Sequence, residues 1–529
     1  MMLRHAIYRH TAPAAVLLAL LFAPMPVTAE PTTAQSWGKQ IYLEGTSPTG
    51  GEITAIVGTE GVSLPASAVP CASCHGTDGL GRPEGGVIPP DIRWSELTKT
   101  YDHVHENGRR HPAFDENNLA RLIRTGLDPA SNRLDKSMPL YNMSVEDMDS
   151  LVAYLRFLEN DMDPGISKDS IQVGTLLPLQ GGQGALGQAM AQVMLAHFKE
   201  VNERGGVFGR KLELLAIPYG DSAQSTLDNL SSAIRKEGVF ALVGAYTIGM
   251  DEQILELLRE LGVPLVGPFT LNPGDAFVNA DIFYIYPGFA EQAEVLAAQA
   301  IAQMKGGRGT LVLVGPEGEH VDELIAAVEE KQPKDRTFKS ETLRYQRGKL
   351  DAAVLAKSLQ QAESDAVLFL GIQAEFEELL NALAGIKHYP GMFALSAYVP
   401  RPMFEAPEGF NERIYLAYPT LSGDVSAAGR AEYQRLADLH ALPPGHLQGQ
   451  VAALAAAKLL VEGLRGAGQT LSRQKLVEAI EALYRYDTGL TPPLTYGPNR
   501  RIGAMGAHLM KVDLVNKTNK PVGEWYEVR

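Results

Sequence analysis

The sequence predicts a multidomain protein whose larger, C-terminal part consists of two α/β lobes. The chain has 529 residues, too many for one hydrophobic core, so two or three domains are expected. From Ile171 onward, short apolar runs alternate with amphipathic segments, as in doubly wound parallel sheets. A polar stretch with a Pro-Gly pair precedes this part, and its residues 161–170 are predicted to be a linker.

The N-terminus has the pattern of a secretory signal peptide over residues 1–29. Arg4 and Arg9 give a basic start, Ala14–Ala23 form a short apolar run, and small residues precede Glu30. An uncleaved anchor helix is the alternative, but the run is short and is followed by prolines. No later segment is long and apolar enough to span a membrane. We therefore expect the mature chain to be exported to the periplasm without a membrane span.

The charge balance excludes some classes of partner. The formal net charge is −15 and the apolar fraction is 45%. An acidic chain of this kind is not expected to bind nucleic acid or anionic membranes. The charge is compatible with docking to a basic protein surface, and equally with solubility alone.

Both cysteines of the chain lie in the segment "CASCH", as Cys71 and Cys74, and His75 follows directly. This is the attachment pattern for one covalent haem c, with two thioethers and an axial histidine on the iron. A disulfide, a zinc half-site and a redox dithiol are the alternatives. Zinc would need two more ligands at matched spacing, and the dithiol would need a βαβ context. Haem is therefore favoured, with His75 as an iron ligand.

The second axial ligand is expected downstream of the cysteines. Met138 precedes Pro139 in a polar segment and is the predicted iron ligand, and Met143 is the weaker candidate. A Met/His pair raises the reduction potential and suits electron transfer. The nearby histidines are expected to be solvated rather than functional: His103, His105 and His111.

Residues 30–160 resemble a class I cytochrome c domain, which implies an all-α fold. The resemblance is carried by "WGKQIYLEG", "CASCHGTDGLGRP", "GVIPPDI" and "SMPLYNMSVEDMDSLVAYLRFL". It implies that the carbonyl of Pro90, or of Pro89, accepts a hydrogen bond from His75 and fixes its ring. The sequence departs from the family in a long insert, residues 47–70, ahead of Cys71.

Residues 171–529 resemble a type I periplasmic binding protein, in particular the branched-chain amino acid receptors that serve ABC transporters. "VNERGGVFGRKLEL" is the most specific segment. The resemblance implies one lobe of about residues 171–288 plus a return after 418. The other lobe would hold about 290–415 plus part of the C-terminus. No catalytic or nucleotide-binding motif is present, so we expect no enzyme.

The same resemblance places ligand-binding residues in the loops of both lobes. They are Tyr246, Thr247, Phe269, Thr270, Glu319, Gln373, Ser396 and Tyr398. Ser396 stands where the amino acid receptors hold an acid, and Ile248 stands near the place of their serine. An amino acid would leave its polar ends poorly paired, so a less polar or aromatic small molecule is expected.

Together these features predict a periplasmic solute-binding protein that also carries electrons through a His/Met-ligated haem. Its expected partners are the small molecule, a redox protein and, as a further candidate, an ABC permease. The alternative is an electron-transfer subunit of a periplasmic dehydrogenase system. In that case the binding domain would serve for docking or sensing.

Overall fold

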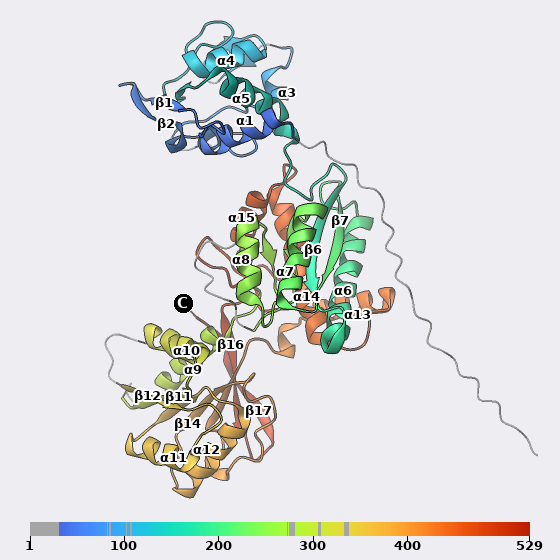
Figure 1. The fold of residues 1–529 in the computed structure, drawn as a ribbon. Coiled ribbons are helices and arrows are strands. Elements are labelled where there is room, and N and C mark those ends of the chain that lie inside the picture. The colour runs from blue at the N-terminus through green and yellow to red at the C-terminus, as the bar shows by residue number, and fades with distance from the viewer. Residues whose placement is uncertain are drawn as a thin grey trace, which may run out of the picture. The chain divides into compact units, whose positions relative to one another are not determined.

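The protein is described by a computed structural model that covers residues 31–528. The description omits residues 82, 84, 85, 102, 106, 107, 272, 274–280, 305–307 and 333–337. The predicted signal peptide, residues 1–29, lies outside the described residues. The chain divides into two compact units, Met1–Asp161 and Met162–Arg529, which are considered separately below (Figure 1).

The N-terminal unit is organised around two crossing helices, α1 (Thr33–Glu44) and α5 (Val145–Phe157). A capping box at Thr32 starts α1, and the Ser144 hydroxyl caps α5. The helices cross closely at Gly38, where a Cβ atom would lie 2.0 Å from the Ser150 carbonyl oxygen. The other helices of this unit are α2 (Cys71–His75), α3 (Trp94–Leu97) and α4 (Glu116–Thr125).

The insert of this unit folds into a β-hairpin, which was not predicted from the sequence. Strands β1 (Thr54–Val57) and β2 (Val62–Pro65) are antiparallel, and β1 also pairs with β5 (Leu140–Asn142). The sheet order is β2-β1-β5. A second small pair joins β3 (His103–Val104) to β4 (Arg110–His111). The helical core is therefore accompanied by a three-stranded sheet.

The first lobe of the C-terminal unit contains a parallel sheet in the order β10-β9-β8-β6-β7. Its strands are β6 (Ser170–Leu177), β7 (Lys211–Pro218), β8 (Ala241–Val243), β9 (Leu265–Val266) and β10 (Ile282–Phe283). The helices of this lobe are α6 (Gly184–Glu203), α7 (Ala223–Ser232), α8 (Asp251–Leu261), α13 (Ala427–His440), α14 (Leu447–Ala467) and α15 (Arg473–Glu481).

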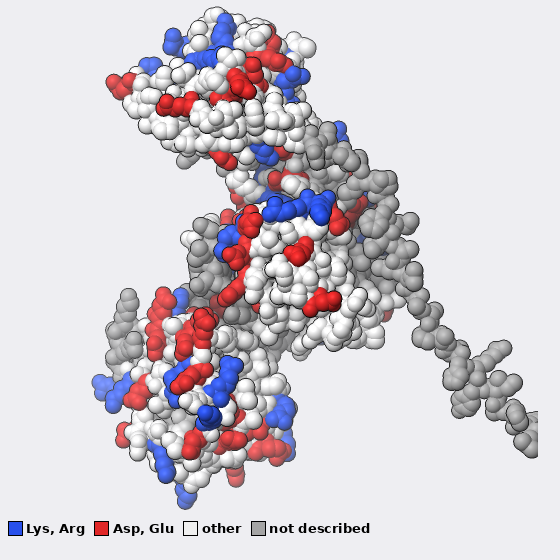
Figure 2. All heavy atoms as spheres, viewed as in Figure 1, with Lys and Arg blue, Asp and Glu red and all other residues white. Residues whose placement is uncertain are grey.

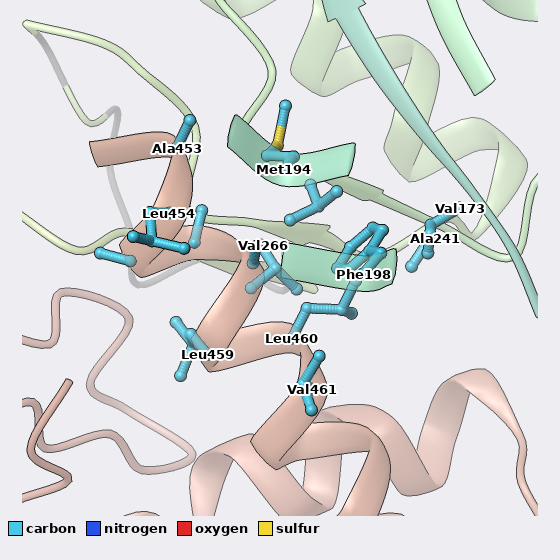
Figure 3. Packing of buried hydrophobic residues seen from close by; sticks show 14 of the residues in the cluster. Val173, Met194, Phe198, Ala241, Val266, Ala453, Leu454, Leu459, Leu460 and Val461 are labelled. Carbon is cyan, nitrogen blue, oxygen red and sulfur yellow. The ribbon is translucent and has the colours of Figure 1, made fainter. Parts of the chain in front are cut away.

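Helix α14 belongs to the first lobe although it follows the second lobe in sequence. Its side chains Leu454, Leu459 and Leu460 lie in one buried cluster with Phe198 of α6 and Val266 of β9 (Figure 3). The expected return of the chain after residue 418 is therefore built into the core of this lobe. Among the described residues no helix, α14 included, has the length and apolarity needed to cross a bilayer.

The second lobe contains a sheet in the order β12-β11-β13-β14-β15-β16-β17. The strands from β12 to β15 are parallel, and the last two are antiparallel. The strands are β11 (Thr310–Pro316), β12 (Lys339–Tyr345), β13 (Ala366–Phe369), β14 (Gly391–Leu395), β15 (Ile414–Tyr418), β16 (Gly506–Asp513) and β17 (Thr518–Glu527). The helices are α9 (Phe289–Gln303), α10 (Glu319–Lys331), α11 (Ala352–Gln361) and α12 (Gln373–Gly385).

The chain passes into the second lobe ahead of α9, leaves it after β15 and re-enters it at β16. Parallel strands place their carboxyl ends at one edge of each sheet, where ligands of such folds bind. On the face shown in Figure 2, acidic and basic side chains of the described residues are interspersed.

Candidate functional site

In the N-terminal unit, Cys71, Cys74 and His75 lie on the short helix α2, which begins after Pro70. Residues three apart on a helix share one face, so both thiols point to the same side. Burial raises the pKa of the Cys71 thiol to about 12, so this thiol is protonated at neutral pH and is no ready thiolate. Among the described residues, no three His, Cys, Asp or Glu side chains are grouped to hold a metal ion. A zinc site and a reactive dithiol are thus disfavoured.

His75 is buried, with 6% of its surface exposed, and its ring is held from one side. Its Nδ1 atom lies 3.2 Å from the carbonyl oxygen of Pro90. A carbonyl can only accept, so Nδ1 carries the hydrogen and Nε2 is left with the lone pair. Burial lowers the pKa of His75, with the Pro90 bond acting in the opposite direction. A neutral imidazole with a free Nε2 is the form that binds haem iron, so these residues fit a c-type haem.

The loop that carries Pro89 and Pro90 comes close to the backbone that follows α2, and the point of closest approach is Gly81. A Cβ atom on Gly81 would lie 2.1 Å from the carbonyl oxygen of Pro89, and its φ is +89°. A side chain at position 81 would therefore push the Pro89–Pro90 loop away from the segment that carries His75. Next to these prolines, Val87 and Ile88 are solvent-exposed apolar residues, a surface suited to a porphyrin face.

The two candidate methionines have different environments. Met143 is a core residue with 8% exposure, whereas Met138 is half-buried at the margin of the same cluster. Met138 follows a turn in which its backbone N–H donates to the Asp135 carbonyl at 3.1 Å. Since Met143 is already used in packing, Met138 is the better candidate for the second iron ligand.

The three histidines downstream form a cluster that is not solvated as expected. His103 and His111 are buried, at 7% and 4% exposure. The His105 and His111 Nε2 atoms lie 2.8 Å apart, and Arg109 binds both His105 and the buried Asp128. Burial, and then the Arg109 charge, lower the pKa of His105 to about 4. The expectation of solvent exposure is therefore wrong for His103 and His111, which pack inside the β3–β4 region.

In the first lobe, aromatic side chains meet at the carboxyl ends of the strands. The rings of Tyr246 and Phe269 stack at a centroid distance of 5.9 Å, and Tyr219 lies edge-on to Tyr246 at 6.1 Å. All three are half-buried. The buried hydroxyl of Thr247 donates to Asp251 at 2.5 Å, so this side chain already has a partner. Thr270 is half-buried beside Phe269.

In the second lobe, Phe289, His320 and Tyr398 form a corresponding cluster. Phe289 lies 5.2 Å from Tyr398 and 5.8 Å from His320 between ring centroids. The Tyr398 hydroxyl lies 2.9 Å from His320 Nε2. Burial raises the pKa of Tyr398 to about 12, so its hydroxyl keeps its proton and can donate to that nitrogen.

The other predicted residues of this lobe are Gln373, Glu319 and Ser396. Gln373 is buried, its Oε1 accepts from the Arg401 N–H at 2.9 Å, and its Nε2 donates to Glu377 at 2.7 Å. It fixes the loop before Arg401 rather than offering a free amide. Glu319 is exposed at the start of α10, and Ser396 is half-buried just after β14.

Several residues of these strand ends were not predicted from the sequence. They are Tyr219, Phe289, His320, Tyr345 and Glu375, and the Tyr345 hydroxyl donates to Glu375 at 2.7 Å. Each lies within a few residues of a strand's carboxyl end or at the start of a helix. Counting polar and aromatic residues at those positions would have found them.

Two family descriptions match the chain. The one described as "Periplasmic binding protein" covers residues 170–519, and the one described as "Cytochrome c" covers residues 66–159. A "Leu/Ile/Val-binding protein homolog 3" of Brucella melitensis is 27% identical over 232 residues, which is 42% of this chain and 60% of that protein. A "Leu/Ile/Val-binding protein homolog 2" of Brucella abortus is 32% identical over 111 residues, 21% of this chain and 29% of that protein. The chain thus spans less than two thirds of these relatives.

Solved structures share the fold of the C-terminal unit. A putative branched-chain amino acid ABC transporter protein from Rhodospirillum rubrum aligns with a TM-score of 0.54 at 17% identity, over 67% of this chain and 100% of that one. An ABC transporter substrate-binding protein from Sphaerobacter thermophilus gives 0.51 at 17% identity, over 68% and 98%. At such identity the likeness concerns the fold alone.

Proposed function

The chain belongs to the periplasmic binding protein family and carries a cytochrome c domain, and from this we propose that it is a haem-c-containing solute-binding protein of the periplasm. In this proposal a small molecule binds between the two lobes. Electrons pass through one covalent haem held by Cys71 and Cys74, with His75 and Met138 on the iron. The protein carries out no catalysis of its own.

The observation that carries the redox half is the orientation of His75. The carbonyl of Pro90 holds the Nδ1 hydrogen, so the ring presents the lone pair of Nε2 from the end of the "CASCH" helix. When bound, a His/Met-ligated haem supplies a one-electron couple at raised potential. The protein's part is to fix the imidazole, to attach the porphyrin and to supply the methionine.

The ligand half rests on the aromatic strand ends. Tyr246 and Phe269 in one lobe, and Phe289 and Tyr398 in the other, offer flat apolar surfaces with hydroxyl groups. The resemblance to the amino acid receptors implies that Ser396 stands where they hold an acid for the ligand's ammonium group. An uncompensated ammonium costs binding free energy, so the proposed ligand is an aromatic small molecule rather than a simple amino acid.

A thermal-shift screen of the haem-loaded protein tests the ligand class. Benzoate, benzyl alcohol, L-phenylalanine and L-leucine are the probes, and a probe at 100 times its Kd stabilises by about 2.7 kcal/mol. We expect an aromatic probe without an amino acid group to raise Tm, and L-leucine to leave it unchanged. Stabilisation by L-leucine alone would contradict the proposed ligand class.

Two alanine variants locate the site. Tyr246→Ala is expected to abolish the shift by the aromatic probe. Tyr389→Ala is the matched control, because Tyr389 forms a similar aromatic pair with Phe410, at 5.2 Å, but precedes β14 at the opposite sheet edge. The control is expected to lower Tm without changing the shift. Equal loss in both variants would argue against binding at the carboxyl edge.

The second candidate function is an electron-transfer subunit whose large unit docks or senses. It is favoured by the formal net charge of −15, which suits a basic redox partner. The two functions differ in the rate of haem reduction by a partner, with and without the aromatic probe, taken together with the thermal shift. A rate that the probe leaves unchanged, in a protein that the probe stabilises, favours the solute-binding function. A rate strongly reduced by salt, in a protein that the probe does not stabilise, favours the docking role, and a rate set by the probe favours the sensing role.

A further inference from the structure

The hairpin of the insert pairs with β5, the strand that follows Met138 in the chain. Strand β1 is the central strand of its sheet and pairs with β5 through Thr54–Asn142, Ala55–Tyr141 and Ile56–Leu140. Strand β5 starts two residues after Met138. The insert is therefore hydrogen-bonded to the stretch of chain that fixes the position of this methionine.

The insert is anchored at both of its ends. At its start, the Ser47 hydroxyl donates to the Asp147 carboxylate of α5 at 2.8 Å. At its end, the Tyr141 hydroxyl donates to the Val69 carbonyl at 2.6 Å. Val69 is two residues before Cys71, so this bond links the methionine segment directly to the haem-attachment helix. Tyr141 itself is buried, with 5% exposure.

The methionine segment has no regular secondary structure of its own, and it is ordered by turns around the buried Asp128 and at Asp135. Between Gly126, which ends α4, and Leu140, which begins β5, the chain forms no helix or strand, only the isolated bridge between Leu127 and Arg133. Loops of this length are uncommon and costly to order. The turn around Asp128 holds the first part of this loop, whereas residues 135–138 depend on the turn at Asp135 and on the β5 strand that follows.

We propose that the 47–70 insert and Tyr141 form a brace that positions Met138 for the haem iron. The inference rests on the proposed ligation by His75 and Met138. Tyr141 touches no iron ligand directly in this scheme and is a positioning residue. Loosening the brace would favour replacement of the methionine by an external ligand.

The test compares Tyr141→Phe with Tyr42→Phe in the full-length, haem-loaded protein. Tyr42→Phe is the control, because the Tyr42 hydroxyl is also buried and donates at 2.6 Å to a carbonyl flanking the same helix, that of Gly76. The Tyr141 hydroxyl differs in that it also interacts with the Cys71 side chain. Only Tyr141 belongs to the methionine segment. Imidazole is titrated into the ferric protein, and its binding is followed by loss of the long-wavelength absorption of methionine-bound ferric haem.

We expect Tyr141→Phe to bind imidazole about fivefold more tightly, the effect of one lost hydrogen bond. Tyr42→Phe is expected to bind as the wild type does, although both variants lose stability. Equal affinities in the two variants would overturn the brace. Met138→Ala tests the ligation separately from the brace. If this variant has the same haem spectrum as the wild type, Met138 is not an iron ligand, and the brace proposal fails with it.

Hydrogen exchange on the wild type gives a measurement that needs no variant. With imidazole bound, the brace predicts that amides of β1 and β5 stay protected while those of residues 135–138 lose protection. If β5 exchanges as fast as the loop before it, the insert does not hold the segment and the inference is wrong.

Discussion

The pair formed by His508 and Asp424 should make the C-terminal unit sensitive to pH near neutrality. The His508 Nε2 atom lies 2.7 Å from the Asp424 carboxylate, and its Nδ1 atom lies 2.9 Å from the carbonyl oxygen of Glu524. Both partners can only accept, so the ring must donate from both nitrogens and therefore carries a positive charge. Asp424 follows β15 and His508 lies in β16, so the pair ties together two segments by which the chain leaves and re-enters the second lobe.

The sign of the pH dependence follows from the two pKa shifts. Burial acts to lower the pKa of His508, but the bond to Asp424 raises it overall. Burial acts to raise the pKa of Asp424, but the bond to His508 lowers it overall. The stabilisation by His508 is full below the ordinary histidine pKa of 6.5 and is lost as pH rises through the raised value. The stabilisation by Asp424 is present above the ordinary aspartate pKa of 3.8 and is lost as pH falls through the lowered value.

Deprotonation of His508 removes one charge-assisted hydrogen bond, worth about 2 kcal/mol. Trp525 reports the change, because its ring lies edge-on to His508 at 4.8 Å and the other two tryptophans belong to the N-terminal unit. Urea unfolding followed by this fluorescence should show the loss as pH rises above 6.5 and through the raised pKa of His508. Asp424→Asn and His508→Gln should each remove the part of the pH dependence that belongs to this pair.

A double-mutant cycle gives the decisive number, since it isolates the pair from other effects of each change. The coupling free energy between Asp424→Asn and His508→Gln should be about 2 kcal/mol at pH 5.5 and much smaller at pH 9. A coupling that is absent at the acidic pH, or that does not change with pH, would refute the argument from the two acceptors.

Two further predictions concern the cores of the units. Met138→Ala should remove the long-wavelength absorption band of ferric haem and lower the midpoint potential. Met143→Ala should keep that band and lower the free energy of unfolding, measured by urea titration, by about 2–3 kcal/mol. Arg473→Met should destabilise the C-terminal unit by about 3 kcal/mol, because its guanidinium donates to the buried carbonyls of Val239 at 2.8 Å and Phe240 at 2.9 Å. Unfolding followed by Trp525 fluorescence checks this, and a loss below about 0.5 kcal/mol would contradict it.

Long regular elements of the fold follow directly from the sequence. An amphipathic segment after Ile171 becomes α6, Gly184–Glu203, and the apolar run "GTLVLVGP" becomes β11. These elements are buried on one face or on both, so their periodicity is strong. Strand β17 was not predicted, because it is largely exposed and carries no apolar run.

The two candidate sites differ in how far apart in the sequence their residues lie. The candidate haem-attachment residues could be predicted because Cys71, Cys74 and His75 lie within the single five-residue helix α2, where spacing defines their geometry. The ligand residues depend on how separate loops meet. Gln373 shows the difficulty, since its position after β13 was expected but its amide is bonded to Arg401 and Glu377. Sequence gives the place of a side chain on a loop, whereas its hydrogen-bond partners are decided by packing.

The insert carries a local sequence signal for a hairpin, but that signal does not show which other strand the hairpin pairs with. "ITAIV" and "VSLP" are rich in β-branched and apolar residues and flank "GTEG", where Gly58 and Gly61 take positive φ values of 70° and 69°. The turn residues alone could therefore have predicted a hairpin. Its partner could not be predicted in this way, because β5 is only three residues long and lies far along the chain from β1. The consequence for function, a strand placed against the methionine segment, arises from that long-range pairing alone.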